Sequence, residues 1–353
     1  MFARVAIASN ALDTNDLPLP VANVLHRALI HEMRAHGRLV FGSDPEVQSL
    51  LKAIATGPGL TPDARTEWRE TLLLLLKAKR ITVLHEADRA ALADVTTLID
   101  LRKWWGPSTD LAVVGHASCA PLGVPSDTGI LTDPEFGPDV ATTATATGSP
   151  AIARLKDLAD RGIAGTGTPR ETFWHDVLEP IASSAQNATV MDGYLYKSVC
   201  DITEGKPWAR QWRAEQATWL LDHLDAVMAV GAEVHLVGSK QPEYSHLDAQ
   251  TTAAAIRDHW KPTKVGRLHR VTLTLASPAR GERFPHDRHI RFSTGSAIEI
   301  PAGFDRLRED NIRDPEGMKW NYRWRTENLK ELQAAEQRAT AMAQHPIVTI
   351  FQR

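Results

Sequence analysis

The chain has 353 residues, of which 43% are hydrophobic and 24% are charged, and its formal net charge is −3. This composition is typical of a globular protein, and the length allows two domains, because single cores stop growing near about 250 to 300 residues. Two cysteines and no CxxC spacing exclude a disulfide framework and a zinc motif, and with no signal peptide and no apolar run of about 20 residues we expect a soluble, cytoplasmic protein.

Apolar segments alternate with helical patterns in the first part of the chain. Strands are expected at 5–8, 38–41, 81–85 and 111–115, and helices at about 21–33, 44–56 and 62–79. Thr61 before Pro62 is a typical start for the last of these helices. The alternation predicts an α/β domain with a mostly parallel sheet over residues 1–165.

The stretch that follows has little periodicity. Residues 118–150 are rich in Pro, Gly, Ser and Thr, which predicts a long connection or a functional loop before a helix near 150–161. Cys119 lies at the start of this stretch, and we interpret it as a buried structural cysteine. Gly165 and Gly167 follow no strand, which favours a hinge over a phosphate loop.

A second series of elements follows. It comprises a helix at 170–184, a strand at 187–195 that contains Asp192 and Tyr194, a helix that ends near Met228, a strand at 233–240, a helix at 246–260, a strand at 269–277 and a hairpin at 284–305. This order predicts a mixed sheet flanked by helices over residues 166–316. Residues 317–353 then form a basic and aromatic segment that ends in a helix.

The hairpin sequence, FPHDRHIRFSTGSAIEIPAGFD, places two histidines and two arginines on one short strand. Successive side chains of a strand face opposite sides, so His286 and Arg288 share one face while Asp287, His289 and Arg291 share the other. This separation disfavours a metal site made from His286, Asp287 and His289. We expect neither a metal nor another cofactor.

The surrounding segment is strongly basic. Residues 257–291 hold nine Arg or Lys against three Asp or Glu. Such a cluster is either a solvated basic face or a surface that binds polyanions. The candidate phosphate-binding residues are Arg267, Arg270, Arg283, Arg291 and Lys240.

Several motifs resemble one known family. HDR at 286–288, a turn at Gly295 and GFD at 303–305 are similar to the C-terminal, phospholipase-D-like domain of MIT-domain proteins that act in cytokinesis. MDGYL at 191–195 resembles the Asp-Pro-Tyr strand end of that family. The resemblance covers about residues 170–308, and the three-helix N-terminal module of the family is absent.

The resemblance implies a phosphodiesterase chemistry. In the wider phospholipase D superfamily one histidine attacks phosphorus, and a second histidine donates a proton to the leaving oxygen, without a metal. His286 would be the nucleophile or the acid, Arg288 would clamp the phosphate, and Ser293 and Asp305 would complete the catalytic set. Only one such motif is present, so a complete site requires a homodimer.

Other interpretations of the same residues stay open. His286 could be a hydrogen-bonded structural histidine, and Asp192 either caps the following turn or lines a cleft with Tyr194. In residues 319–325 aromatic side chains alternate with polar and cationic ones, and the aromatic residues are Trp320, Tyr322 and Trp324. These rings either stack on nucleic-acid bases or pack on one face of a strand.

We therefore expect a metal-independent phosphodiesterase, specifically a nuclease of a prokaryotic defence system. Nucleic acid, a second copy of the chain and other defence proteins are the expected partners. The alternative is a non-catalytic phosphate-binding module for nucleic acid or anionic lipid headgroups. A third hypothesis places an enzyme in the first domain, although its strand ends show no recognisable catalytic constellation.

Overall fold

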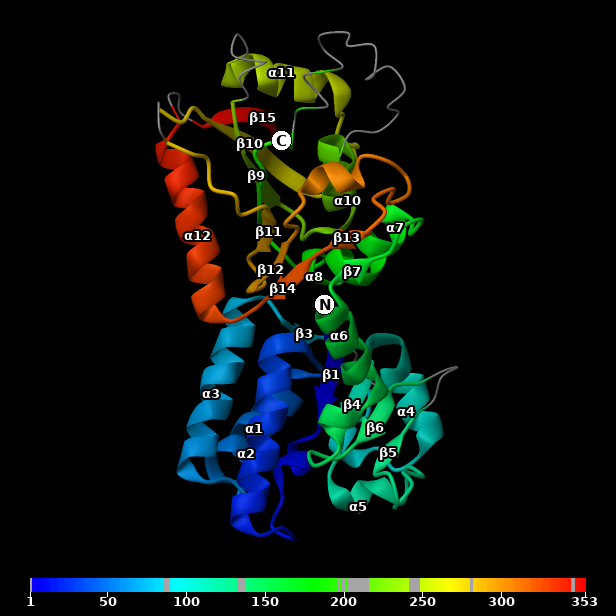
Figure 1. Cartoon of the computed structure of the whole chain (residues 1–353). Helices are drawn as coiled ribbons and strands as arrows, with labels where there is room; N and C mark the ends of the chain where they lie inside the picture. The colour runs from blue at the N-terminus through cyan, green and yellow to red at the C-terminus, as the bar shows by residue number, and fades with distance from the viewer. Residues whose placement is uncertain are drawn as a thin grey trace. The chain divides into compact units, whose positions relative to one another are not determined.

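The computed structural model shows an α/β protein whose chain divides into two compact units, residues 1–158 and 159–353 (Figure 1). The structure describes residues 2–85, 89–132, 137–195, 197, 201, 216–240, 248–279, 282–343 and 347–353. One sheet is mostly parallel and the other is mixed, which confirms the predicted fold class. The division falls seven residues before the expected boundary at 165.

The first unit contains a six-stranded sheet in the order β3-β2-β1-β4-β6-β5. The strands are β1 (Ala3–Ile7), β2 (Gly37–Phe41), β3 (Ile81–Val83), β4 (Leu111–Val113), β5 (Ile130–Leu131) and β6 (Asp139–Ala141). All pairs are parallel except β5 with β6. The helices are α1 (Leu19–His36), α2 (Asp44–Thr56), α3 (Pro62–Lys77), α4 (Leu98–Trp105), α5 (His116–Cys119) and α6 (Pro150–Arg161). The order reverses at β1, as in doubly wound sheets.

The helices α2, α3 and α6 begin where the sequence predicts, and α1 begins two residues earlier, whereas α4 and α5 were not predicted. The Thr61 side chain accepts a hydrogen bond from Ala64 N at the start of α3, as expected for an N-cap. In contrast, β6 lies inside residues 118–150, which the sequence predicts to be a connection. Only three residues form this strand, and the Pro, Gly and Thr around it hide the pattern. All three are buried, because the parallel strands are covered on both faces.

A buried histidine links three segments of the first unit. His26 of α1 is fully buried, and its Nδ1 accepts a hydrogen bond of 3.4 Å from Trp68 Nε1. Because the indole can only donate, the proton of the neutral ring sits on Nε2, 3.3 Å from Thr14 Oγ1. Burial lowers the pKa of His26 to about 4.

The second unit contains a seven-stranded mixed sheet in the order β14-β12-β11-β8-β9-β10-β15. Its strands are β8 (Asn187–Met191), β9 (Ala232–Ser239), β10 (Leu268–Ala276), β11 (His289–Phe292), β12 (Ser296–Glu299), β14 (Asn321–Arg323) and β15 (Val348–Gln352). β8, β9 and β10 are parallel, and the outer strands are antiparallel to their neighbours. A small second sheet pairs β7 (Ile163–Ala164) with β13 (Met318–Lys319).

The segment 317–353 belongs to this unit and is not a separate appendage. β14 and β15 form its two sheet edges, and α12 (Thr326–Ala341) packs Ala335 and Ala339 against Met191 and Val237 of the sheet. The remaining helices are α7 (Arg170–Phe173), a π-helical turn (Trp174–Leu178), α8 (Glu179–Ala182), α10 (Gln216–Val227) and α11 (Ala249–His259).

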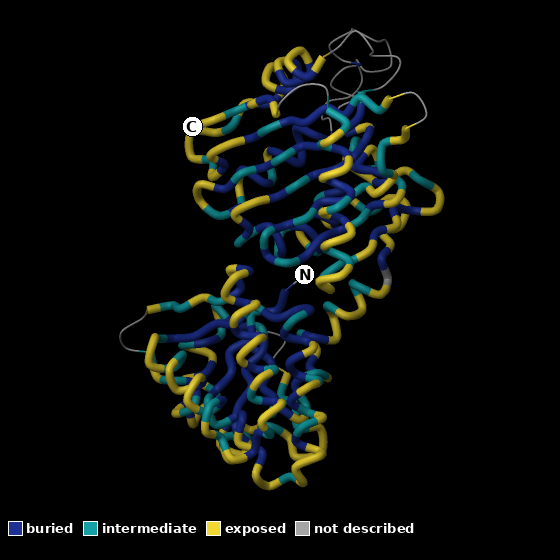
Figure 2. Tube along the Cα trace, turned by 90° about the vertical axis from the view of Figure 1, so that its left-hand side faces the viewer, coloured by how far each residue is buried: buried dark blue, intermediate teal, exposed yellow. Residues whose placement is uncertain are grey.

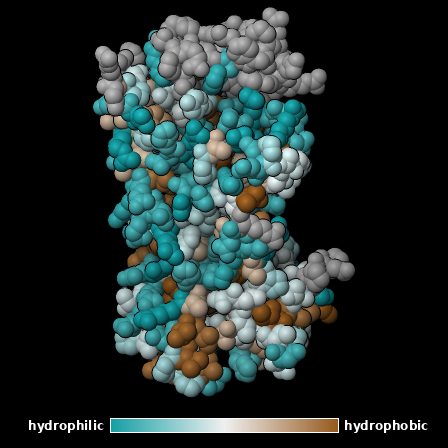
Figure 3. All heavy atoms as spheres, in the orientation of Figure 1, coloured by the Kyte–Doolittle hydropathy of each residue, from teal (hydrophilic) through white to brown (hydrophobic). Residues whose placement is uncertain are grey.

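The central strands of both sheets are mostly buried, whereas the edge strands β3, β5 and β14 are half-buried or exposed. In Figure 2 buried stretches run through the inside of each unit, and exposed residues lie mainly on the outside. In the view of Figure 3, hydrophilic residues cover most of the second unit, and hydrophobic residues gather on parts of the first. Large exposed apolar side chains of the first unit include Leu19, Val24 and Ile99. In the described part of the chain, no helix has the length and apolar character needed to cross a membrane.

Candidate functional site

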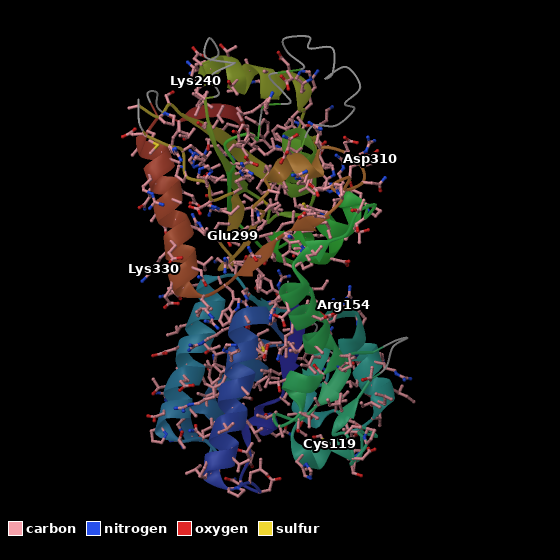
Figure 4. All side chains as sticks on the ribbon, viewed as in Figure 1. Cys119, Arg154, Lys240, Glu299, Asp310 and Lys330 are labelled. Atoms are coloured by element: carbon pink, nitrogen blue, oxygen red, sulfur yellow. The ribbon has the colours of Figure 1, made fainter. Side chains whose placement is uncertain are left out.

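Three segments of the second unit meet at one edge of its sheet, where the parallel strands end. Asp192 follows β8. Lys240, which is labelled in Figure 4, follows β9. β11 runs antiparallel to β8, so the residues that precede β11 lie at this same edge. A methyl group on Gly193 would lie 3.3 Å from Phe284 Cδ1 and 3.8 Å from Ser239 Cβ. Gly193 therefore lies close to both Phe284 and Ser239, so the ends of β8 and β9 lie next to the start of the predicted hairpin.

Asp192 connects this edge to the turn that follows β12. Its Oδ1 accepts a hydrogen bond of 2.8 Å from Tyr194 N, and its Oδ2 accepts one of 2.8 Å from Phe304 N. The carboxyl group is fully buried, and burial raises its pKa although both backbone hydrogen bonds and Arg288 oppose the shift. Asp192 therefore caps the turn at Tyr194 and positions the segment 303–305.

Arg288 is held in place by three neighbours. Its Nη1 donates a hydrogen bond of 3.1 Å to Pro301 O, and its Nε lies 3.9 Å from Asp192 Oδ1. The guanidinium carbon lies 5.5 Å from the centre of the Tyr194 ring, a cation–π arrangement. In the described part of the chain, Nη2 makes no hydrogen bond. The arginine is thus fixed with one donor group unused.

Gly303 allows Arg288 and Asp305 to approach this turn closely. Its φ of 97° lies in the region that favours glycine. A methyl group on Gly303 would lie 2.9 Å from Asp305 Oδ1 and 3.2 Å from Arg288 Nη1. Asp305 itself is exposed and close enough to Asp192 to raise the pKa of that carboxyl further.

His286 lies in a loop, because β11 begins only at His289. His286 and Asp287 are both exposed, so the predicted division between two strand faces does not apply to them. The pleat that would separate them is absent, since no ladder pairs residues 284–288. Within the described residues, the imidazole of His286 has no hydrogen-bonding partner.

Two further cations at this edge have no ion pair or side-chain hydrogen bond among the described residues. Arg283 is exposed, and Lys240 is half-buried. Together with His286 and Arg288 they form what we call the cationic edge: Lys240, Arg283, His286 and Arg288. The carboxylates of Asp287 and Asp305 lie on the same segments, so the edge combines cations with separate acidic groups.

Ser293, predicted to be catalytic, lies at the opposite end of the sheet. Its Oγ accepts hydrogen bonds of 2.9 Å and 3.1 Å from the backbone N–H groups of Gln186 and Asn187. These residues mark the start of β8, whereas Arg288 lies near the end of β8. Ser293 therefore stabilises a turn and does not belong to the cationic edge.

Arg291, predicted to bind phosphate, is occupied by a carboxylate. Its Nε and Nη2 donate hydrogen bonds of 2.8 Å and 2.5 Å to the two oxygens of Glu336 on α12. His289 Nε2 lies 2.9 Å from the same carboxylate. Burial would raise the pKa of Glu336, but the hydrogen bonds from Arg291 and His289 lower it below its ordinary value. These groups hold α12 on the sheet.

Two other predicted phosphate-binding residues also have partners. Arg270 Nη2 lies 2.6 Å from Glu233 Oε2 on the neighbouring strand. Arg267 Nη1 donates hydrogen bonds of 3.2 Å and 3.3 Å to the carbonyls of Val227 and Met228 at the end of α10. Of the five predicted phosphate-binding residues, only Arg283 and Lys240 therefore lie at the cationic edge.

The aromatic residues of the segment 319–325 pack within the unit. Trp320 is 4% exposed and contacts Phe173 edge to face, at 6.1 Å between ring centres. Tyr322 Oη lies 3.2 Å from Ser296 Oγ across the β12–β14 pair, and Trp324 is half-buried beside Arg325. A platform that stacks bases on all three rings is excluded, because Trp320 belongs to the core.

Sequence reasoning missed Phe284 and Pro301, which position the segments of the edge through packing and a backbone carbonyl. Neither residue type signals such a role. No protein-family model matches the chain, and a search of curated proteins finds no relative. The phospholipase-D-like resemblance therefore depends on the motifs alone. Among the described residues, no group of three or more His, Cys, Asp and Glu could hold a metal ion.

Proposed function

We propose that the second unit binds the phosphodiester groups of nucleic acid at the cationic edge. One observation supports the proposal most directly. Arg288 is fixed by Asp192, Pro301 and Tyr194, while the other cations of the edge have no protein partner in the described part of the chain. We place this function in the cytoplasm, since two cysteines fit a reducing compartment.

A fixed arginine suits a phosphate ligand for physical reasons. Its planar fork matches two phosphate oxygens, and fixing it beforehand removes part of the entropic cost of binding. Lys240 and Arg283 can then contact neighbouring phosphates, because their charges are not neutralised within the protein. Arg291 is unsuited, since releasing its largely buried carboxylate partner would cost energy. Arg270 is unsuited because the carboxylate of Glu233 already lies against its guanidinium.

A second candidate function is cleavage of the bound phosphodiester, favoured by the exposed imidazole of His286, which has no hydrogen-bonding partner among the described residues and lies two residues before Arg288. In a homodimer, a nitrogen of His286 would form a bond to phosphorus while the bond to the leaving oxygen breaks. His286 of the second copy would donate its proton to that oxygen. Water would then attack phosphorus, release the phosphate monoester and regenerate the imidazole.

Binding is tested with single-stranded and duplex DNA, RNA and vesicles of anionic lipid. Arg288→Ala should weaken nucleic-acid binding by about 10- to 100-fold, the value of a lost hydrogen bond between charged groups. Arg270→Ala is the matched control and should change binding little. Equal affinity of wild type and Arg288→Ala would mean that nucleic acid binds at another site. Binding of vesicles but not of nucleic acid would mean that the ligand is an anionic lipid.

Cleavage is tested separately in the presence of EDTA. If His286 is the nucleophile, wild type should cleave at least one nucleic acid, and His286→Ala should lose cleavage while retaining most of its binding. Arg288→Ala should lose both. Binding without cleavage would support the phosphate-binding function and contradict the enzymatic one. Cleavage that strictly requires magnesium would overturn the phosphohistidine mechanism.

A further inference from the structure

The first unit contains a cavity of about 480 Å³ at the edge where its parallel strands end. Its floor includes Ala11 after β1, Val114 after β4 and Thr143 after β6. Residues 124–129 and the short helix α5 complete its walls. The volume lies in the range of cavities that hold small molecules.

The position of this cavity follows from the strand order. β2 and β3 lie on one side of β1, and β4 and β6 lie on the other side. The strand order therefore reverses at β1, and a crevice is expected beside the loops that leave β1 and β4. In doubly wound sheets ligands bind in this crevice. The cavity thus lies where the topology predicts a ligand.

Hydrogen bonds between the loops shape the cavity without a ligand. Asn10 Oδ1 accepts a hydrogen bond of 3.2 Å from Gly115 N, which joins the loops after β1 and β4. Thr143 Oγ1 donates to Ala11 O at 2.6 Å, which joins the loops after β6 and β1. A larger residue does not fit at position 115, because a methyl group on Gly115 would lie only 2.9 Å from Asn10 Cγ. The crevice is consequently preformed.

The hydroxyl groups of the cavity present lone pairs to a ligand. Thr143 and Thr145 donate their hydroxyl hydrogens to the backbone carbonyls of Ala11 and Gly129. Thr14 and Thr128 do the same. A hydroxyl whose hydrogen is engaged can only accept further hydrogen bonds. Thr145 already accepts two from Thr142, and Thr14 and Thr128 each accept one, from His26 and from Ile130 N. Among the described residues, Thr143 and one lone pair each of Thr14 and Thr128 therefore remain as acceptors.

The charged groups that line the cavity are mostly acidic, with one titratable histidine, His116, beside them. Three carboxylates, those of Asp13, Asp16 and Asp127, line the cavity, and none of the described lining residues is Lys or Arg. The loop after β1, with the sequence ASNALDTND, contains no glycine that would let a pyrophosphate approach the backbone. The lining thus disfavours nucleotides and other phosphates and favours a ligand rich in donors.

We propose that this cavity binds a small organic amine that carries several N–H or O–H donors, such as a polyamine or an amino sugar. Ammonium groups would contact the three carboxylates near the mouth, and hydroxyl or amine hydrogens would bond to the threonine oxygens. The site is distinct from the cationic edge, and its ligand has the opposite charge.

The test uses the full chain with spermidine and kanamycin as probes, and calorimetry as the measurement. Wild type should bind at least one amine, and neither ATP nor NAD should compete. Asp13→Asn and Asp127→Asn should each weaken binding about tenfold, the value of one charge-assisted hydrogen bond. Asp94→Asn changes an exposed carboxylate outside the cavity and should bind as wild type does.

Cys119 provides a second readout, because it lines the cavity on α5 (Figure 4). A bound amine should slow its alkylation by uncharged N-ethylmaleimide in wild type and in Asp94→Asn, but not in the double variant Asp13→Asn/Asp127→Asn. Peptide mapping separates Cys119 from Cys200. Amine binding that is unchanged in the double variant, or tighter binding of ATP than of either amine, would overturn the proposal.

Discussion

The two units place candidate sites at equivalent edges of their sheets but equip them with opposite chemistry. In the first unit the strand ends surround a cavity whose lining is largely apolar and whose polar groups include three carboxylates and several hydroxyls. In the second unit the strand ends present Lys240, Arg288 and the cations of the preceding loop. Backbone topology therefore decides where a ligand can bind, and a few side chains after the strands decide its charge.

The units also differ in how they use their charged residues. In the second unit, arginines close in sequence have different tasks: Arg288 has an unused donor group in the described structure, whereas Arg291 is bound to Glu336. In the first unit, the exposed carboxylates of Asp13 and Asp16 have no cationic partner among the described residues. Charge that is not neutralised internally is the charge available to a ligand.

The largest expected effect tests the division between structural and ligand-binding arginines. Glu336→Ala should lower the free energy of unfolding by about 3 to 5 kcal/mol, because it leaves Arg291 and the buried His289 without their carboxylate. Urea denaturation measures the change. The matched control is Glu233→Ala, which removes the exposed partner of Arg270 and should cost less than about 1 kcal/mol.

Equal destabilisation by the two substitutions would mean that Arg291 is no more structural than Arg270. The contrast between the cationic edge and the other arginines would then be lost. Nucleic-acid binding that is weakened in Glu336→Ala while the unit stays folded would have the same consequence.

The second effect concerns acid stability of the first unit. The pKa of His26 is lowered to about 4, so between its ordinary value of 6.5 and 4 the unfolded chain binds a proton that the folded chain does not. Stability is therefore lost as the pH falls through this window, by up to about 1.4 kcal/mol per pH unit. Urea denaturation at a series of pH values measures the slope.

His26→Gln should reduce this slope, although it also lowers stability at pH 7 by disturbing the bond from Trp68. His116→Gln changes an exposed histidine of the same unit and serves as the control. An unchanged slope in His26→Gln would show that other groups cause the acid sensitivity.

The smallest effect separates the two sites by their response to salt. If Arg288, Lys240 and Arg283 each neutralise one phosphate of duplex DNA, the logarithm of affinity should fall with the logarithm of salt at a slope of about −2.7. Arg283→Ala should make the slope less negative by about 0.9. Arg267→Ala should leave it unchanged, because that guanidinium binds the carbonyls at the end of α10.

The same Arg283→Ala variant should bind amines in the first unit as wild type does. A change in both affinities would indicate that one site, and not two, accounts for the binding of both ligands.

Local sequence determined the α/β class and many element boundaries. Thr61 before Pro62 predicts the start of α3, because capping depends on residues within one turn. The GFD motif at 303–305 likewise marks a special turn, since only glycine adopts the backbone of Gly303 without strain. The basic segment 257–291 contains three residues of the proposed cationic edge, namely Arg283, His286 and Arg288.

Tertiary structure alone decided which of these residues can meet a ligand. Arg283 and Arg291 are both arginines of the basic segment. In the described structure, Glu336, 45 positions after Arg291, binds Arg291 and not Arg283. Likewise the cavity of the first unit combines residues near 13, 116 and 143, which the sequence shows merely as scattered Asp, His and Thr. Ion pairs such as Arg291–Glu336 and cavities lined by several loops depend on contacts between segments that are distant in the sequence. No local pattern of residue types encodes such contacts.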